Sequence, residues 1–476
     1  MSTVHKFGAF DALFIFAFIR VLSFLTWDFS LANQLITAVL VVIFFCISVK
    51  NIALAWVILV ADFLLNGAGH FFELFGLLSR TWFLGIFGVI WFVKKIKQKD
   101  FYPQLPRSLS VSMIVAGMFI LLAIANGYVH AHPQILILQD AVLYLFFLLA
   151  FPTVDLLRYP DARLLKIAKG YILGSTLFSL VTFFIYSSGL GVLRDPYYDW
   201  FRHIAAGKIT DLGNHFFRIV LPEHLLMVPA ILIIASSLMK NPKNRQFWLY
   251  ALCASFVLML NFSRMYFIGL VVGLLVLKLR EDFKKWFLVS SLTAMSIVVL
   301  FVSVHFLASR GQSTSLGLLE DRISGVVEPT DEISGSIRMA LLPDIFRTIQ
   351  LHPWLGSGLG TTVSYRDPTT KIVETRTQFD WGYLEMFAEL GIVGAFAYIV
   401  FLILLLYALF RAFSACNTTS PTLQCLFRGL LAGAIAFFVI NGSTPALFQG
   451  FGVLYFVFIF SMVVFSERNS GVPIRA

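Results

Sequence analysis

Long apolar runs recur along almost the whole chain, and they constrain its fold more than any other feature. Hydrophobic residues make up 59% of the 476 residues, enough for about fourteen helices of the roughly 20 apolar residues that cross a bilayer. Charged residues make up 13%, against roughly 25% in soluble proteins. Because a soluble domain needs a polar exterior, the sequence predicts an all-α polytopic membrane protein. It excludes a cytosolic enzyme, a nucleic-acid-binding protein and a secreted disulfide scaffold.

Charged residues and clusters of Gly, Pro or Asn divide the apolar runs into fourteen predicted spans. These cover residues 11–27, 31–49, 51–66, 80–93, 109–126, 136–151, 167–187, 220–239, 247–262, 265–279, 286–306, 383–411, 428–445 and 448–465. The chain is thus expected to contain N-terminal transmembrane helices (1–187), a first large loop (188–219), central helices (220–306), a second large loop (307–382), and C-terminal helices with a tail (383–476). We expect about 14 transmembrane helices.

Positive charge predicts the orientation of these spans. With the N-terminus inside, the cytoplasmic segments carry 22 Lys and Arg, the external segments carry 13, and Arg20 lies within the first span. Lys and Arg accumulate on the cytoplasmic loops of membrane proteins. We therefore expect both termini in the cytoplasm and both large loops outside. The net charge of +10 needs no nucleic-acid partner.

The second large loop is too long for a simple connection, and its sequence predicts a folded helical part. Pro343 suits the first turn of a helix, and Pro353 ends that helix ten residues later. Between the prolines, Ile345, Ile349 and His352 fall on one helix face. We expect this helix to pack over the membrane domain.

The external basic residues are mostly arginines. Eleven of the thirteen are Arg, whereas the cytoplasmic segments hold nine Arg and thirteen Lys. Orientation requires only positive charge, but the planar guanidinium can bind phosphate oxygens in pairs. The bias predicts a phosphorylated or diphosphorylated substrate at the outer face. The alternative is that these arginines form ion pairs with Glu320, Asp321, Glu328, Asp331 and Glu332.

Arg264 is the most informative of these arginines. It lies in Asn261-Phe262-Ser263-Arg264, between two long apolar spans that almost no loop separates. An arginine at such depth usually faces a polar cavity or a ligand, although it can also anchor a helix end by snorkelling. Arg218 likewise lies just ahead of an apolar span. Both are candidates for binding phosphate.

Gly356, Gly358 and Gly360 follow the predicted helix of the second loop. They do not form a nucleotide-binding loop, because they follow a helix rather than a strand and lack the Lys-Ser/Thr pair. We interpret them as a turn that lets the backbone approach a ligand or a neighbouring helix. The chain has no Asp-x-Asp motif and no His-x-x-x-His pair. We therefore predict neither a metal site nor a cofactor.

The segment His352-Pro353-Trp354-Leu355-Gly356-Ser357-Gly358-Leu359-Gly360 resembles the signature loop of the O-antigen ligase and polymerase superfamily. The resemblance extends upstream to Ser336-x-Arg338 and downstream to Trp381-Gly382-Tyr383-Leu384-Glu385 and Glu389-Leu390-Gly391. Ser263-Arg264 and Arg218 are also similar to family positions. In all, the resemblance covers roughly residues 215–400.

This resemblance implies a glycosyltransferase of the bacterial inner membrane that uses no metal. It would transfer an undecaprenyl-diphosphate-linked glycan to an acceptor sugar hydroxyl at the periplasmic face, the acceptor being a lipid-linked repeat unit or the lipid A-core. Arg264 and Arg218 would neutralise the leaving diphosphate, with Arg338 as a third candidate. His352 would act as a base or orient the acceptor. The other expected substrate-binding residues are Arg347, Arg202, Gly356, Gly358 and Tyr383.

Two Arg-x10-Gly pairs bear on the choice between a polymerase and a ligase. Arg202…Gly213 and Arg347…Gly358 lie one in each large loop, as described for polymerases of this superfamily. Chance produces about as many such pairs, so only their placement favours a polymerase. The competing class is a flippase for lipid-linked oligosaccharides, which would place charges inside a central cavity. The candidates within the spans are Arg20, Asp62, Asp140 and Glu223.

Overall fold

The computed structural model describes residues 7–67, 69–98, 107–157, 162–311, 333–368, 370–416 and 421–470. The chain forms two compact units. The first consists of Met1–Tyr102, Asp155–Ser263 and Asp282–Thr314, and the second of Pro103–Val154, Arg264–Glu281 and Ser315–Ala476. Each unit is assembled from three separated stretches of chain, so neither corresponds to one half of the sequence.

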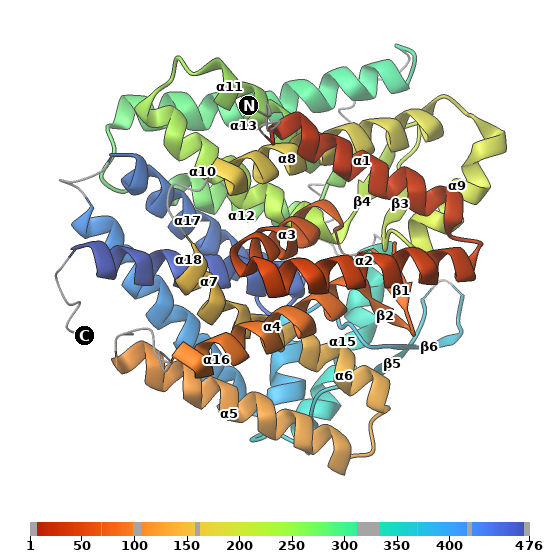
Figure 1. Cartoon of the computed structure of the whole chain (residues 1–476). Helices are drawn as coiled ribbons and strands as arrows, with labels where there is room; N and C mark the ends of the chain where they lie inside the picture. Colours follow the sequence, from red (N-terminus) through yellow and green to blue (C-terminus); the bar gives the residue numbers. More distant parts are fainter. Residues whose placement is uncertain are drawn as a thin grey trace. The chain divides into compact units, whose positions relative to one another are not determined.

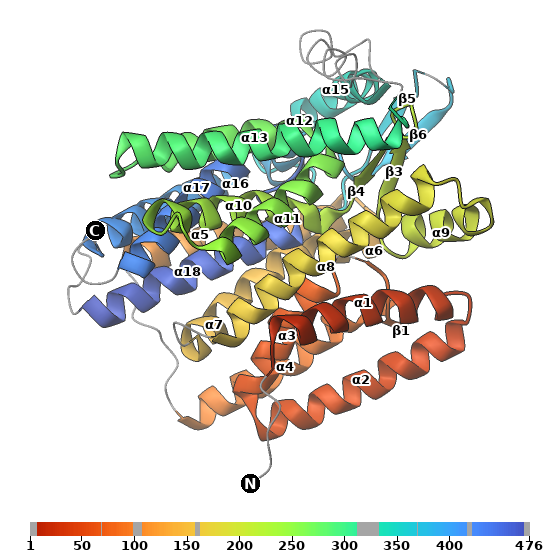
Figure 2. The ribbon, with the colours of Figure 1, turned by 90° about the horizontal axis from the view of Figure 1, so that it is seen from above.

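The first unit is built mainly of helices. These are α1 (Ala9–Thr26), α2 (Ser30–Lys50), α3 (Ile52–Leu65), α4 (Ser79–Gln98), α8 (Ala162–Ser187), α9 (Gly191–His203), the 3-10 helix η2 (Pro222–Leu226), α10 (Met227–Lys240), α11 (Arg245–Asn261) and α13 (Phe283–Ala308). Two antiparallel hairpins join them: β1 (Glu73–Leu74) with β2 (Leu77–Leu78), and β3 (Lys208–Asp211) with β4 (Phe217–Val220). Helix α1 packs on α8 (Figure 1), and α13 packs on α10 and α11 (Figure 2).

Short polar side chains cap the first turns of two helices in this unit, α11 and α13. Asn244 precedes α11, and its side chain accepts hydrogen bonds from the backbone N–H groups of Gln246 and Phe247. Asp282 caps α13 in the same way. Such caps satisfy donors that have no partner inside the helix.

The second unit contains α5 (Arg107–Val129), α6 (Gln134–Leu145), the 3-10 helix η1 (Phe146–Leu149), α7 (Ala150–Leu156), α12 (Arg264–Val276), α15 (Ile333–Leu351), α16 (Gly382–Ala415), α17 (Pro421–Ile440) and α18 (Gly450–Ser470). One antiparallel hairpin, β5 (Val363–Arg366) with β6 (Val373–Arg376), follows α15. Helix α5 packs on α16, and α12 packs on α17.

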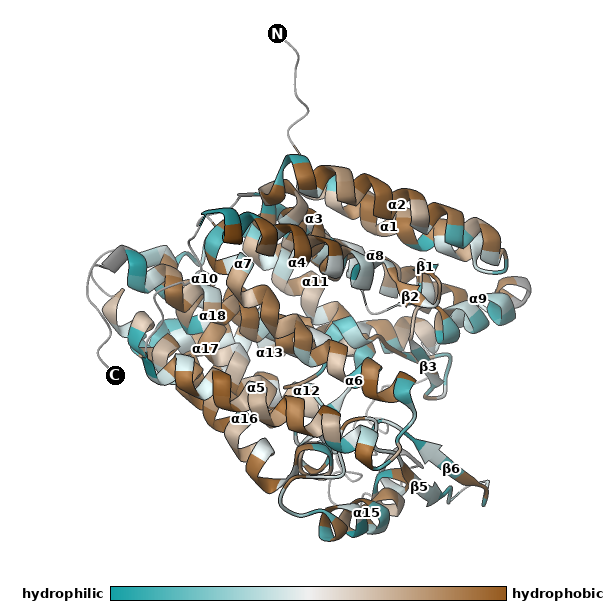
Figure 3. Ribbon diagram, turned by 60° about the horizontal axis from the view of Figure 1, so that its bottom comes forward, coloured by the Kyte–Doolittle hydropathy of each residue, from teal (hydrophilic) through white to brown (hydrophobic). Residues whose placement is uncertain are grey.

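Ten helical segments of the described chain are long and apolar enough to cross a membrane. Figure 3 shows hydrophobic residues along most of α1, α2, α5 and α16. On α1, Phe10, Phe14 and Phe18 are each more than half exposed, as suits a surface that faces lipid. The predicted class, an all-α polytopic membrane protein, is therefore confirmed.

The described chain has fewer long apolar helices than the fourteen predicted spans. Each of the fourteen predicted spans overlaps a described helical segment, but four of these helices do not reach the length or hydropathy of the ten. Three of them, α3, α11 and α12, have 14, 17 and 13 residues, and α4 carries three lysines in its last five residues. The count of about 14 spans stays a prediction.

The second large loop is folded wherever it is described. Helix α15 packs against β5 and α16, around a core of Leu341, Ile345, Val363, Tyr365, Phe379 and Ala388. This confirms the expected helical loop. The acidic residues proposed as ion-pair partners, Glu320, Asp321, Glu328, Asp331 and Glu332, lie outside the described residues.

The predicted start of the loop helix is wrong, whereas its end is confirmed. Helix α15 begins at Ile333, and Pro343 lies inside it rather than in its first turn. A proline inside a helix removes one backbone hydrogen bond, but Leu341 and Ile345 on either side are completely buried and hold the helix together. The helix ends at Leu351, two residues ahead of Pro353.

Candidate active site

Two of the predicted site residues of the second unit, Arg338 and His352, lie toward opposite ends of α15. Arg338 is the sixth residue of the helix, and His352 directly follows its last residue. Fourteen residues separate them, which at 1.5 Å per residue is about 20 Å along the helix axis. The structure therefore groups these residues at two places, which we call the arginine end and the histidine end of α15.

The arginine end contains Arg264 and Arg338. Arg264 is the first residue of α12, and the chain reaches it through Phe262, which caps α11 in the left-handed conformation with a φ of 48°. Arg338 lies near enough to Arg264 for the two positive charges to repel each other. The Nε of Arg338 is buried and has no hydrogen-bond acceptor among the described residues. An anion would stabilise both guanidinium groups, and the N-terminus of α12 favours negative charge at the same place.

The core beside the arginine end holds the backbone of Arg338 in place. The indole N–H of Trp381 donates a hydrogen bond of 3.1 Å to the carbonyl oxygen of Arg338. Trp381 in turn packs against the loop core. The preceding Phe379 is completely buried and donates its backbone N–H to the Glu385 carboxylate at 2.9 Å. Arg338 thus projects from a fixed segment of helix.

The histidine end contains His352 and two histidines that the sequence reasoning missed, His130 and His132. They lie in the turn between α5 and α6. The ring centroids of His130 and His352 are 4.3 Å apart, and those of His130 and His132 are 6.1 Å apart. Burial lowers the pKa of His352 below its ordinary value, and the charges of His130 and His132 lower it further. The His130-x-His132 pair was visible in the sequence, but nothing there linked it to His352.

Hydrogen bonds fix the ring orientation of both added histidines. The Nδ1 of His130 lies 2.8 Å from the carbonyl oxygen of Ser357, and the Nδ1 of His132 lies 2.9 Å from that of Leu359. Because a carbonyl oxygen only accepts, each Nδ1 carries the hydrogen. The Nε2 of the neutral ring is then an acceptor.

The glycine loop, residues 356–360, lies in close contact with α5 and α16 of the second unit. A Cβ on Gly356 would lie 2.2 Å from the carbonyl oxygen of Glu389, and one on Gly358 would lie 2.1 Å from the backbone nitrogen of Gly127. Both glycines have φ values, 71° and 96°, that strain other residues. These glycines therefore allow the backbone to approach neighbouring helices, which was one of the two alternatives drawn from the sequence.

The backbone N–H groups of this loop are used inside the protein. Gly356 donates to His352, Ser357 to Ala388, Gly358 to Glu389 and Leu359 to Ala123, all at carbonyl oxygens, and Gly360 donates to the Asp140 carboxylate at 2.8 Å. No donor of this run is left for a phosphate. A direct contact of Gly356 or Gly358 with substrate stays a prediction.

The other predicted substrate-binding residues are more scattered. Tyr383 is half-buried, and its hydroxyl donates a 2.7 Å hydrogen bond to the carbonyl oxygen of Phe438. Arg347 is exposed on α15. In the first unit, Arg202 is exposed on α9, and the Nε of Arg218 donates a 2.7 Å hydrogen bond to the carbonyl oxygen of Asn261. Asn261 is the last residue of α11, three residues ahead of Arg264 in the chain.

The charged residues within the spans bond to other parts of the protein. In the first unit, Arg20 and Glu223 form an ion pair of 3.1 Å with at most 3% of either side chain exposed. Arg20 also donates to the carbonyl oxygen of Leu65 at 2.7 Å. Asp62 accepts a hydrogen bond from Asn66 at 3.1 Å, and Asp140 holds the glycine loop. Among the described residues, no three His, Cys, Asp or Glu side chains are arranged to hold a metal ion.

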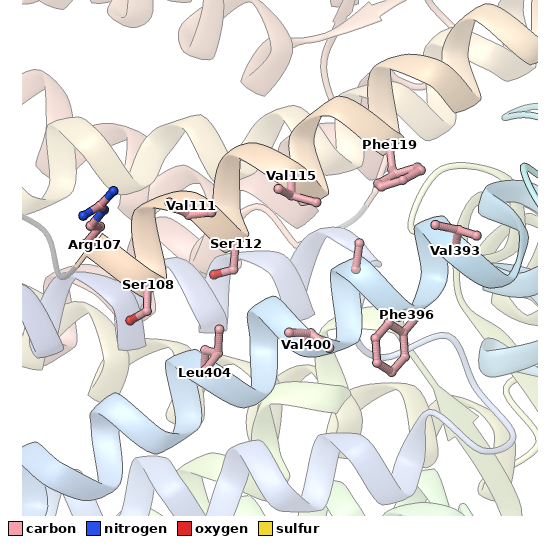
Figure 4. Close-up of a pocket in the computed structure, with 11 residues that line it drawn as sticks. Arg107, Ser108, Val111, Ser112, Val115, Phe119, Val393, Phe396, Val400 and Leu404 are labelled. Atoms are coloured by element: carbon pink, nitrogen blue, oxygen red, sulfur yellow. The ribbon is translucent and has the colours of Figure 1, made fainter. Parts of the chain in front are cut away.

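An apolar groove of about 1010 Å³ runs between α5 and α16 in the second unit. Figure 4 shows Arg107, Ser108 and Ser112 toward one end of this groove and Phe119 and Val393 toward the other. The second end adjoins the loop after α15. There the backbone N–H of Val393 donates to Trp354, and that of Leu359 donates to Ala123.

Residues 249–399 match the sequence model of a family described as O-Antigen ligase. Over this segment, which is about a third of the chain, the protein is similar to that family. The predicted relationship to the O-antigen ligase and polymerase superfamily is thereby confirmed. The matched segment includes α15, Arg264, His352 and the glycine loop, whereas His130 and His132 lie outside it. No curated protein matches the chain significantly.

Proposed function

We propose that this protein transfers a glycan from undecaprenyl diphosphate to an acceptor sugar hydroxyl at the periplasmic face of the bacterial inner membrane, without a metal. In this step the acceptor oxygen attacks the anomeric carbon of the donor glycan. The bond between that carbon and the diphosphate oxygen breaks, and the hydroxyl loses its proton to a base. Undecaprenyl diphosphate leaves as an anion.

The observation that carries this proposal is the pairing of Arg264 with Arg338. Two guanidinium groups repel each other at this place, and the buried Nε of Arg338 has no acceptor among the described residues. A diphosphate supplies several negative oxygens, and its charge increases as the glycosidic bond breaks. Preorganised donors aimed at that developing charge lower the barrier of the reaction. Arg218 stays a candidate for a third contact.

The distance between the two ends of α15 favours one of the two roles considered for His352. A base must come within about 3 Å of the proton it removes. The attacking hydroxyl lies beside the diphosphate, whereas His352 is about 20 Å along α15 from Arg338. We therefore propose that His352 orients the acceptor. Arg347, Arg202, Gly356, Gly358 and Tyr383 stay proposed substrate contacts.

We favour a polymerase over a ligase because each large loop carries one Arg-x10-Gly pair, Arg202…Gly213 and Arg347…Gly358. A flippase is the alternative function. It would need charges that are available to a moving substrate, but Arg20 and Glu223 are paired with each other and Asp140 is bonded to Gly360. Because these charges are bonded within the protein, they favour a glycosyltransferase over a flippase.

The glycans of a deletion strain would test the function. Loss of chain length beyond one repeat unit indicates a polymerase, and intact polymer that is missing from the lipid A-core indicates a ligase. Lipid-linked units that accumulate in the cytoplasm would contradict both and indicate a flippase. Purified protein that releases undecaprenyl diphosphate from a lipid-linked donor only when an acceptor is present would establish the transfer reaction itself.

A further inference from the structure

The separation of the two ends of α15 places a requirement on the length of the substrate. The hydroxyl that attacks the anomeric carbon lies next to the diphosphate, because bond formation requires contact between the reacting atoms. In the proposed function that position is the arginine end. A sugar bound at the histidine end is therefore a different sugar of the same glycan, about 20 Å away.

The histidine end presents groups that suit a sugar. His130 is exposed and His352 is half-buried, and their rings are in contact at 4.3 Å between centroids. The bond from Nδ1 of His130 to Ser357 leaves its Nε2 as an acceptor for a hydroxyl. Two residues beyond His352, the side chain of Trp354 is 67% exposed. Hydroxyl groups bind imidazole nitrogens, and the apolar face of a sugar ring packs on exposed aromatic side chains.

We propose that His130 and His352 form a distal glycan subsite, which binds one sugar of the acceptor while another sugar reacts at the arginine end. The proposal rests on the proposed function, in which Arg264 and Arg338 mark the position of the diphosphate. It makes the protein selective for oligosaccharide acceptors that reach from one end of α15 to the other, and it makes His130 a residue that determines specificity.

The groove between α5 and α16 favours the acceptor over the donor glycan as the occupant of this subsite. Its lining includes Val111, Val115, Val400 and Leu404, and one end adjoins the loop that follows His352. Such a groove suits the polyprenyl chain of a second, lipid-linked glycan. The glycan of that molecule would leave the groove at the histidine end and extend along α15, whereas the donor is held by its diphosphate at the arginine end.

The protonation state of His352 agrees with this role. Burial, His130 and His132 all lower its pKa, so its ring is neutral and can accept a hydroxyl hydrogen at neutral pH. The elements packed on α15 carry further titratable groups, Glu385 and Glu389 on α16 and Tyr365 and Arg366 on β5. The charges that act on His352 are those of the two histidines.

Acceptor glycans truncated sugar by sugar, assayed against one fixed donor, test the proposal with the full-length protein. His130→Asn keeps an N–H donor for Ser357 but removes the ring, and His352→Asn is its partner variant. We expect kcat/KM for the wild-type protein to rise with acceptor length and then level off. His130→Asn should lose about 3- to 10-fold with the longest acceptor and nothing with the shortest, and His352→Asn should lose more with the longest acceptor than with the shortest.

A matched control is His203→Asn. His203 is also exposed, and its Nδ1 bonds a backbone carbonyl oxygen, that of Asp199, at 3.0 Å. This variant should show the wild-type length dependence. An equal loss with short and long acceptors, no loss with either, or a dependence on donor length alone would each overturn the distal subsite.

Binding of the longest acceptor without a donor separates this proposal from the proposed function. The wild-type protein should bind that glycan more tightly than its shortest truncation, and His130→Asn should remove the difference. This result would support the subsite even if the transfer assay fails. Equal binding by the wild type and His130→Asn would overturn the subsite even if transfer succeeds.

Discussion

The two ends of α15 differ in how they meet their neighbours. At the arginine end, like charges approach each other, and the buried Nε of Arg338 has no acceptor among the described residues. At the histidine end, His130 and His132 are bonded to the glycine loop, and the loop N–H groups are bonded to protein acceptors. The first arrangement brings two positive charges together beside a buried donor, whereas in the second the Nε2 of His130 stays an acceptor. We infer that the arginine end is built around an anion and the histidine end around a neutral ligand.

The largest effect on turnover is expected from substitutions of Arg264 at the arginine end. Arg264→Lys keeps the charge but loses the paired N–H contacts to phosphate. A charge-assisted hydrogen bond contributes roughly 1.5–3 kcal/mol, so turnover of a lipid-linked donor by purified protein should fall about 10- to 150-fold. Arg264→Ala should fall further.

The control for that variant is Arg366→Lys. Arg366 lies in β5, and its Nε donates to the carbonyl oxygen of Lys371 at 2.9 Å. Its replacement should leave turnover unchanged. If Arg264→Lys retains at least half of wild-type turnover, Arg264 anchors a helix end and does not bind the diphosphate.

A second prediction concerns the close packing of the glycine loop at the histidine end. Gly358→Ala places a Cβ 2.1 Å from the backbone nitrogen of Gly127, at a φ of 96° that strains alanine. We expect a loss of about 1–3 kcal/mol of stability, because the backbone of both segments must shift. Thermal unfolding in detergent measures it. Gly76→Ala is the control, since Gly76 also has a positive φ but nothing within 4 Å of an added Cβ. Equal melting temperatures for the two variants would contradict the close packing of the loop.

The smallest predicted effect is a shift in pH dependence. Burial, and after it the charges of His130 and His132, hold the pKa of His352 below its ordinary value. As the pH falls through that pKa, His352 gains a proton, no longer accepts a hydroxyl hydrogen, and the KM for a long acceptor should rise. In His130→Asn the pKa of His352 moves upward, so the pH profile of the His352 ring itself, followed by NMR, should shift to higher pH. An unchanged profile would show that the two rings do not interact.

The transmembrane helices could be predicted from sequence because each one depends on its own apolar residues. The predicted start of α15 failed because a local rule for Pro343 was outweighed by the burial of Leu341 and Ile345 in a core shared with β5 and α16. That core contains residues from separate elements, so its strength could not be judged from the helix alone.

In the candidate site, too, features that depend on local sequence could be predicted, and features that depend on contacts between distant segments could not. Arg264 could be proposed as a site residue from the sequence, since an arginine between two apolar spans is costly without a partner. Its neighbour Arg338 was predicted through a resemblance, and the proximity of the two charges required the fold. His130 was missed because its contact with His352 joins distant parts of the chain. No spacing rule applies to such a contact.

The affinity of the purified protein for undecaprenyl diphosphate shows whether Arg264 and Arg338 bind the diphosphate. We expect Arg338→Gln and Arg264→Lys each to weaken binding about tenfold or more, and His352→Asn to leave it unchanged. All three should bind undecaprenol, which lacks the diphosphate, as the wild type does. Wild-type affinity for undecaprenyl diphosphate in both arginine variants, or an equal loss in His352→Asn, would contradict the claim that the arginine end of α15 is the diphosphate site.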